Sequence, residues 1–256
     1  MVNAIYVWGY ARSTGARVLL RIEDHDRGRS RLAFEHSLLE DLAWLGFVAD
    51  EPAVRQSDRS RVYQDALARL RRTHHVYACD CSRKDTGGER YPGRCRSRQL
   101  PETPGRGLRV ELKPGVERFY DLRLGTQEQS PAEQCGDLLI RDRDGNWTYQ
   151  FAVTVDDYVQ GISLIIRGED LLASTGRQLR LGRMLGRTDP PQFLHHPLIL
   201  KRSGEKLSKA ADDSGVRELR ASGLAAPQVI GHAAAVVGLI PQEIAVHASD
   251  VEQLFR

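Results

Sequence analysis

Short apolar runs alternate along this chain with longer segments whose apolar residues recur every three or four positions. The short runs have the pattern of buried strands, and the longer segments have the pattern of amphipathic helices. The predicted strands are residues 17–22 and 162–166, and the predicted helices are residues 1–13, 32–45, 59–72 and 171–185. Strands that alternate with helices favour an α/β fold, in which helices cover both faces of a parallel sheet. Such folds bind ligands at the carboxyl ends of their strands.

Three side chains near predicted strands could bind an amino acid. Glu23 and Arg167 each end a buried strand, and Tyr149 lies on a further strand predicted for residues 147–155. Arginine pairs well with a carboxylate through its planar fork of donors, tyrosine offers a directed hydroxyl, and glutamate can hold an ammonium group. An amino acid with a second carboxylate would satisfy all three groups. The alternative is an internal ion pair between Arg167 and Glu23.

The composition is that of an ordinary soluble globular protein. Of the 256 residues, 41% are hydrophobic and 28% are charged, and no apolar run approaches the length that crosses a bilayer. The first residues lack the layout of a signal peptide, so the sequence predicts a cytoplasmic protein without a membrane partner. The net charge is +3, but residues 83–109 carry eight Lys or Arg and three acidic residues. This basic stretch could attract phosphates, although charge alone favours a solvated surface loop.

Three of the four cysteines lie close together in the sequence. Cys79, Cys81 and Cys95 border a segment rich in Gly, Pro and Arg, whereas Cys135 stands apart and is expected to pack as a small apolar residue. In a cytosolic chain this clustering favours a metal over disulfides. Three thiolates and a fourth ligand would complete a tetrahedral zinc site, and zinc would stabilise this irregular segment. The alternative is a set of reduced surface cysteines.

The fourth ligand stays open on chemistry alone. Tyr91 lies between the cysteines, but tyrosinate is an uncommon zinc ligand. His74 and His75 precede Cys79 and are of a more usual ligand type.

A short polar loop near the C-terminal end is suited to a polyphosphate. Lys206 and Lys209 flank Ser208, and the ammonium groups of the two lysines could neutralise charge when an α-phosphate is attacked. A string of this kind also arises by chance as a solvated loop.

Several blocks of the chain, taken in order, carry a resemblance to a known family. They are Arg21-Ile22-Glu23-Asp24, Cys79-Asp80-Cys81, Tyr91-Pro92-Gly93-Arg94-Cys95, Ile166-Arg167-Gly168-Glu169-Asp170 and Lys206-Leu207-Ser208-Lys209-Ala210. In this order they resemble the glutamyl-Q tRNA(Asp) synthetases, the short paralogues of glutamyl-tRNA synthetase among the class I aminoacyl-tRNA synthetases. The resemblance covers nearly the whole chain.

The resemblance implies a Rossmann-like class I catalytic domain with a parallel sheet, a zinc-binding insertion and a short C-terminal helical segment. The implied divisions are the first half of the catalytic domain (1–77), the zinc-binding insertion (78–128), the second half of the catalytic domain (129–200), and the signature loop with C-terminal helices (201–256). In this family the last loop corresponds to the KMSKS signature, with Leu207 in place of Met and Ala210 in place of the final Ser.

The resemblance also implies ligands for individual residues. One structural Zn²⁺ per chain would be held by Cys79, Cys81, Tyr91 and Cys95. Glutamate would be held by Glu23, Tyr149 and Arg167. Lys206 and Lys209 would be catalytic, and Lys209 would contact ATP, which enters with Mg²⁺. The implied enzyme is a cytoplasmic monomer that activates glutamate with ATP and transfers it to the queuosine base of tRNA(Asp).

The HIGH signature and first strand of the family have no counterpart in residues 1–256. This leads to the expectation that these residues alone have little or no glutamate-activating activity, and that an upstream extension with the HIGH element would restore it. One alternative is an inactive, truncated, zinc-stabilised tRNA-binding remnant. Another alternative, the charging of tRNA(Glu), is disfavoured because the chain stops soon after the signature loop.

Overall fold

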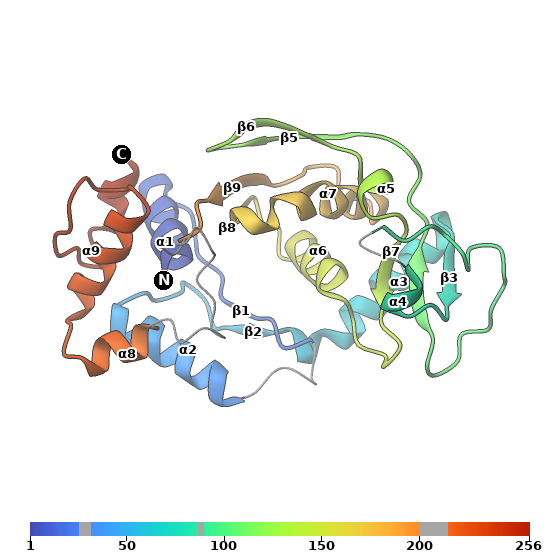
Figure 1. The fold of residues 1–256 in the computed structure, drawn as a ribbon, viewed down its shortest axis with the longest axis horizontal. Helices are drawn as coiled ribbons and strands as arrows, with labels where there is room; N and C mark the ends of the chain where they lie inside the picture. Colours follow the sequence, from blue (N-terminus) through green and yellow to red (C-terminus); the bar gives the residue numbers. More distant parts are fainter. Residues whose placement is uncertain (26–31, 87–89, 200–214) are drawn as a thin grey trace.

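The strands form three small sheets in the computed structural model, which describes residues 1–25, 32–86, 90–199 and 215–256 (Figure 1). β1 (Arg21–Ile22) pairs in parallel with β2 (Val54–Arg55). An antiparallel sheet has the order β3-β4-β7, and a mixed sheet has the order β6-β5-β9-β8. Their strands are β3 (Val76–Cys79), β4 (Gly107–Val110), β5 (Glu117–Asp121), β6 (Gly125–Gln129), β7 (Leu138–Arg141), β8 (Leu164–Gly168) and β9 (Gln192–His196). β8 and β5 both run parallel to β9, which confirms parallel pairing in the part of the molecule that contains Arg167.

The described helices surround these sheets. The longer ones are α1 (Val2–Thr14), α2 (Leu32–Leu45), α3 (Ser60–Thr73), α6 (Tyr149–Val159), α7 (Thr175–Met184) and α9 (Ala226–Val236). The shorter ones are α4 (Arg83–Thr86), α5 (Pro131–Gln134), α8 (Val216–Ala221) and the 3₁₀ segments η1 (Gln56–Arg59), η2 (Glu169–Ser174) and η4 (Val251–Phe255). The helices predicted at 1–13, 32–45 and 59–72 are therefore confirmed. Within the described ranges, none of these helices is both long and apolar enough to span a membrane.

Two large hydrophobic cores stabilise the part of the chain that the structure describes. The first joins α1 to α9 and η4, so the two ends of the chain pack together (Figure 1). Gly9 permits this approach, because a Cβ at that position would lie 2.3 Å from the ring of Phe255. The second core lies between α3, α6, α7 and the antiparallel sheet, and includes Tyr63, Phe151 and Cys135. Cys135 therefore packs as the small apolar residue that the sequence predicts.

The predicted strand at residues 147–155 is wrong, because this segment enters a helix. Tyr149 is the first residue of α6, and the backbone N–H of Ala152 donates to the carbonyl of Thr148 at 2.9 Å. Residues 151–157 are all buried, so α6 has little of the polar face that marks an amphipathic helix. A continuous buried run has the same pattern in a strand and in a buried helix, which explains the error.

Three other predictions need smaller corrections. The strand predicted at 17–22 is reduced to Arg21–Ile22, and the helix predicted at 171–185 begins as the 3₁₀ segment η2 before α7. The helix at 32–45 is present, but the described residues leave Leu32, Phe34 and Leu38 exposed on its apolar stripe. Helical spacing predicts a stripe of this kind without identifying what covers it.

Candidate functional site

Arg167 lies near the carboxyl end of β8 and is almost completely buried, with 6% of its surface exposed. Its guanidinium donates three hydrogen bonds to other side chains. Nε donates to Nε2 of His195 at 3.1 Å, and Nη1 donates to Oε1 of Gln178 at 2.7 Å. Nη2 donates to Oγ1 of Thr175 at 2.9 Å. None of these acceptors is a carboxylate, so the charge of Arg167 is not neutralised by the groups that orient it.

Glu23 and Tyr149 lie near Arg167, and the three residues with their hydrogen-bond partners are called here the arginine-centred site. Burial raises the pKa of Tyr149, the charge of Glu23 adds to this rise, and Arg167 opposes it. Burial lowers the pKa of Arg167, whereas Tyr149, Asp157 and Glu23 act in the other direction. The structure therefore brings together the three residues that the sequence singles out for an amino-acid ligand. Tyr149 arrives there from the first turn of a helix and not from a strand.

Arg21 connects Glu23 to α6. Its Nη1 donates to Asp157 at 2.9 Å and to Gln160 at 3.1 Å, and its Nη2 lies 3.4 Å from Glu23. Burial raises the pKa of Asp157, and Arg21 opposes that shift. These contacts fix the position of Glu23, whose side chain remains 39% exposed and able to receive a cation.

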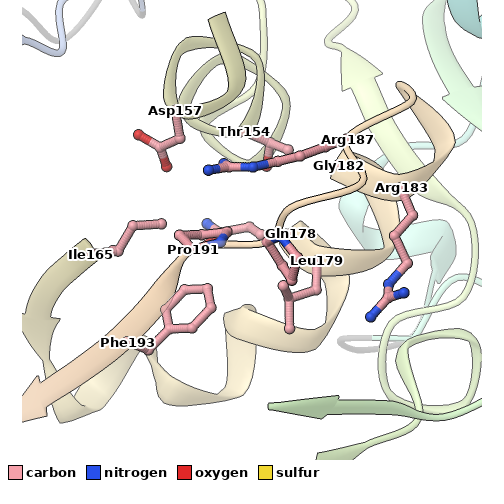
Figure 2. A pocket seen from close by; sticks show the side chains of 11 residues that line it. Thr154, Asp157, Ile165, Gln178, Leu179, Gly182, Arg183, Arg187, Pro191 and Phe193 are labelled. Atoms are coloured by element: carbon pink, nitrogen blue, oxygen red, sulfur yellow. The ribbon is translucent and has the colours of Figure 1, made fainter. Parts of the chain in front are cut away.

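Space for a ligand adjoins this charged cluster. A groove of about 490 Å³ runs between α1 and the segments 16–23 and 160–166, and Arg21, Glu23 and Asp157 line it. A second, much smaller cavity lies between α6, α7 and β9, and Figure 2 shows Asp157, Gln178 and Phe193 around it. That cavity measures about 20 Å³, room for roughly one water molecule, so of these two spaces the groove is the one that could admit a substrate.

The buried carboxylate of Asp156 anchors α6, the helix that carries Tyr149, to its neighbours. Asp156 has no exposed surface and accepts hydrogen bonds from Gln56 at 2.9 Å, Arg59 at 2.7 Å and Tyr63 at 2.8 Å. Its donors come from η1 and α3, so this carboxylate ties α6 to the segment that follows β2. Full hydrogen bonding makes such a buried charge tolerable.

The second candidate site is the cysteine cluster, which consists of Cys79, Cys81 and Cys95 together with Tyr91. The three sulfur atoms lie within 4.8 Å of one another, and Sγ of Cys81 is 3.5 Å from Sγ of Cys95. The phenolic oxygen of Tyr91 is 3.4 Å from Sγ of Cys79 and accepts the backbone N–H of Cys95 at 2.9 Å. Tetrahedral Zn–S bonds of about 2.3 Å place sulfurs about 3.8 Å apart, so the donor set fits such an ion.

The surroundings of Tyr91 fix its ring. Gly136 has a positive φ of 65°, and a Cβ there would lie only 1.9 Å from the carbonyl oxygen of Tyr91. The guanidinium carbon of Arg109 lies 3.7 Å from the centre of the Tyr91 ring, a cation–π contact. The backbone N–H of Tyr91 donates to the carbonyl of Cys135 at 2.9 Å. Tyr91 is thus held beside the cysteines by three separate neighbours.

The two histidines considered as zinc ligands are not in the cluster. His74 interacts with the hydroxyl of Thr73 at 2.8 Å, and Nδ1 of His75 lies 3.5 Å from Glu111. Among the residues that the structure describes, the only possible metal-binding group of Cys, His, Asp and Glu is the cysteine trio.

The two lysines of the predicted signature loop, Lys206 and Lys209, lie outside the described residues.

The sequence did not identify four side chains in the hydrogen-bond network of Arg167, namely Asp121, Thr175, Gln178 and His195. The weak signal for His195 is its position directly after the apolar pair Phe193-Leu194.

Comparisons with known proteins agree with the resemblance seen in the sequence. The family model described as tRNA synthetases class I (E and Q), catalytic domain, matches residues 2–230. The glutamyl-Q tRNA(Asp) synthetase of Symbiobacterium thermophilum is 38% identical, over 99% of this chain and 86% of that protein. The glutamyl-Q tRNA(Asp) synthetase of Burkholderia mallei is 42% identical, over 82% of this chain and 74% of that protein.

A solved structure gives the same result for the fold. The glutamate-tRNA synthetase of Elizabethkingia anophelis superimposes with a TM-score of 0.80 at 25% identity, over 98% of this chain. The chain spans 61% of the length of that synthetase. An α/β class I synthetase catalytic fold is thereby established.

Proposed function

The chain belongs to the glutamyl-Q tRNA(Asp) synthetase family of class I synthetases, and from this premise we propose that it activates glutamate with ATP and transfers it to the queuosine base of tRNA(Asp). The observation that carries the proposal is the convergence of Glu23, Tyr149 and Arg167, of which Glu23 also lines a groove that could admit a substrate. A buried arginine whose charge is not neutralised by its orienting partners is a strong partner for a carboxylate.

In the proposed complex Arg167 pairs with a carboxylate of glutamate, and the hydroxyl of Tyr149 donates a hydrogen bond to glutamate. Glu23 pairs with the ammonium group of glutamate. The other carboxylate attacks the α-phosphate of ATP, pyrophosphate leaves, and glutamyl-adenylate forms. The queuosine base then displaces AMP. Chemistry of this kind depends on positioning and charge stabilisation, so we assign no general base.

ATP enters with Mg²⁺, and we propose that Lys206 and Lys209 neutralise the charge that develops on its phosphates, with Lys209 contacting ATP. Both lysines lie outside the described residues, so this assignment rests on the signature sequence.

We further propose one structural zinc ion per chain, held by Cys79, Cys81, Tyr91 and Cys95. The mutual distances of the three sulfurs and the closeness of the Tyr91 oxygen support this ligand set. The ion would supply folding energy to the surrounding segment rather than chemistry at the arginine-centred site. The protein is proposed to act as a cytoplasmic monomer, with residues 1–77, 78–128, 129–200 and 201–256 as its structural divisions.

Glutamate binding tests the arginine-centred site. Arg167→Ala should weaken binding by roughly 2–4 kcal/mol, because it leaves a buried carboxylate of the ligand without its charged partner. Titration calorimetry with glutamate measures this directly, and Arg118→Ala is the matched control because its side chain is 74% exposed and pairs with Glu128. Unchanged affinity in a folded Arg167→Ala protein would show that Arg167 is structural.

The acceptor is tested by transfer of labelled glutamate. We expect that whatever label is transferred is found on tRNA(Asp) that carries queuosine and not on the same tRNA without it. Label on tRNA(Glu) would instead support the glutamate-tRNA synthetase activity suggested by the fold of the Elizabethkingia protein. Glutamate-dependent pyrophosphate exchange separates both enzymes from a remnant that only binds RNA.

A further inference from the structure

Three buried side chains form a line across the mixed sheet behind the proposed glutamate pocket. Asp121 ends β5, His195 lies on β9, and Arg167 lies on β8, and these three strands are neighbours in the order β5-β9-β8. Arg167 and His195 are partners in the strand register. Asp121 and His195 have no exposed surface. The line therefore reaches Arg167 from the interior, on the side away from solvent.

The hydrogen bonds assign the tautomer of His195. Nε of a guanidinium can only donate, so Nε2 of His195, at 3.1 Å, must accept. The proton of the neutral ring is then on Nδ1, which donates to Oδ2 of Asp121 at 2.6 Å. The hydroxyl of Thr175, 3.3 Å from Nε2, is compatible with the same assignment. Burial lowers the pKa of His195, which favours the neutral ring.

Asp121 is itself held by the backbone. Its Oδ1 accepts the N–H groups of Arg123 at 3.0 Å and Leu124 at 2.9 Å, and its Oδ2 accepts the N–H of His195 at 3.1 Å. The carboxylate therefore cannot rotate without breaking main-chain hydrogen bonds. A rigid acceptor of this kind fixes both the tautomer and the plane of the imidazole.

We propose that Asp121 and His195 are positioning residues that aim Arg167 at the carboxylate of the substrate. The inference rests on the proposed role of Arg167 in binding glutamate. His195, Gln178 and Thr175 take one N–H group each from Nε, Nη1 and Nη2. A guanidinium has five N–H groups, so these three bonds leave one on each η nitrogen, and these remain for the Tyr149 hydroxyl, with which Arg167 also interacts, and for a carboxylate of the ligand.

If Asp121 sets the tautomer of His195, the substitution Asp121→Asn should reverse that tautomer. The two main-chain donors at Oδ1 require an acceptor there, so the amide oxygen takes that position and the NH₂ group faces Nδ1 of His195. The imidazole must then carry its proton on Nε2, where it meets the N–H of Arg167 donor to donor. This loss of the correct tautomer should turn Arg167 away although its charge and neighbours remain.

The test compares Asp121→Asn with a matched pair at His195. His195→Gln can keep an acceptor near the Nε2 position, whereas His195→Asn can keep a donor toward Asp121 but has no atom that reaches Arg167. We expect Asp121→Asn and His195→Asn to raise the glutamate dissociation constant roughly tenfold or more, and His195→Gln to stay within about threefold of the parent protein. The dissociation constant for ATP should be unchanged in all three variants, and calorimetry measures both ligands.

A second readout does not depend on glutamate. Nitrogen-15 spectra of the imidazole rings should show His195 of the parent protein as the neutral Nδ1–H tautomer at pH 7.5, and as the Nε2–H tautomer in Asp121→Asn. A charged ring or an Nε2–H tautomer in the parent protein overturns the inference. So does equal glutamate affinity in His195→Asn and His195→Gln when Arg167→Ala binds weakly. If Arg167→Ala binds glutamate normally, the proposed pocket fails instead, and the spectra still decide whether Asp121 sets the tautomer.

Discussion

The cysteine cluster and the arginine-centred site both gather polar atoms inside the protein, but they satisfy them differently. In the cysteine cluster, soft donors approach one another, with sulfurs within 4.8 Å and the oxygen of Tyr91 3.4 Å from Cys79. In the arginine-centred site, Arg167 and its partners form directed donor–acceptor bonds between 2.6 and 3.1 Å long. The first arrangement is suited to an added cation, whereas the second is complete without one.

This difference has a consequence for stability. The segment around the cysteines contains short or irregular elements such as α4, and its small core of Tyr77, Cys79, Tyr91 and Cys95 is separate from the two larger cores. The arginine-centred site instead draws on β5, β8, β9, α6 and α7, which belong to the body of the protein. We infer that metal binding keeps the cysteine cluster structured. The arginine-centred site is instead kept structured by the packing of the strands and helices around it.

Removal of a cysteine ligand should have the largest effect and should remain local. Cys81→Ser is expected to lose the zinc ion and the hydrogen-exchange protection of residues 76–86 and 90–98, because metal binding supplies folding energy to this segment. Glutamate affinity should stay within about twofold, since the arginine-centred site does not share its hydrogen bonds with the cluster. Elemental analysis and amide exchange with mass spectrometry measure the two effects.

The matched control for this experiment is Cys135→Ala. The sulfur of Cys135 donates to the carbonyl of Pro131 at 3.1 Å within the second hydrophobic core, away from the cysteine trio. This variant should retain one zinc ion per chain. Absence of zinc from the parent protein, purified under reducing conditions without chelators, would contradict the metal assignment.

Loss of Asp156 should produce the opposite pattern, a global effect with the metal retained. Asp156→Ala is expected to lower the free energy of unfolding by about 3–5 kcal/mol, because it leaves Arg59 and its neighbours buried without their acceptor. Urea denaturation measures the loss, and Asp144→Ala in an exposed turn should change it by less than about 0.5 kcal/mol. Zinc loss in Asp156→Ala would mean that the two regions are not independent.

The same contrast explains what the sequence could predict. The cysteine ligands lie close together along the chain, so their spacing alone indicated a metal site. Glu23 and Arg167 were paired on the expectation that their strands end at one edge of a single parallel sheet, and they do come close although β1 and β8 belong to different sheets. Asp121 and His195 are 74 positions apart and meet only because β5 pairs with β9. No local pattern carries that pairing, so these positioning residues could be found only from the structure.

The spacing of apolar residues also failed to predict the helix α6, in which most residues are buried. The helices α1, α2 and α3 were predicted because their apolar residues recur at helical spacing. The helix α6 was missed because residues 151–157 are all buried, including the polar Thr154, Asp156 and Asp157, so polar and apolar residues do not separate onto an exposed and a buried face. Tyr149 was therefore grouped with Glu23 and Arg167, near which it lies, but from the wrong element.

The smallest predicted effect is a pH dependence that separates the two regions. Burial lowers the pKa of His195, Asp121 and Glu169 act to raise it, and Arg167 acts with burial. Since the folded pKa lies below the unfolded value of about 6.5, the stability contributed by neutral His195 is present above pH 6.5 and is lost as the pH falls toward the folded pKa. The unfolded pKa limits this loss to at most about 1.4 kcal/mol between pH 7.5 and 5.5. Urea denaturation of the parent protein and of His195→Gln at pH 7.5 and 5.5 isolates the contribution of His195 to the free energy of unfolding. Any loss of metal at low pH is common to the two proteins and cancels in the difference between them. Equal pH dependence in the two proteins would show that His195 is protonated as readily in the folded chain as in the unfolded one.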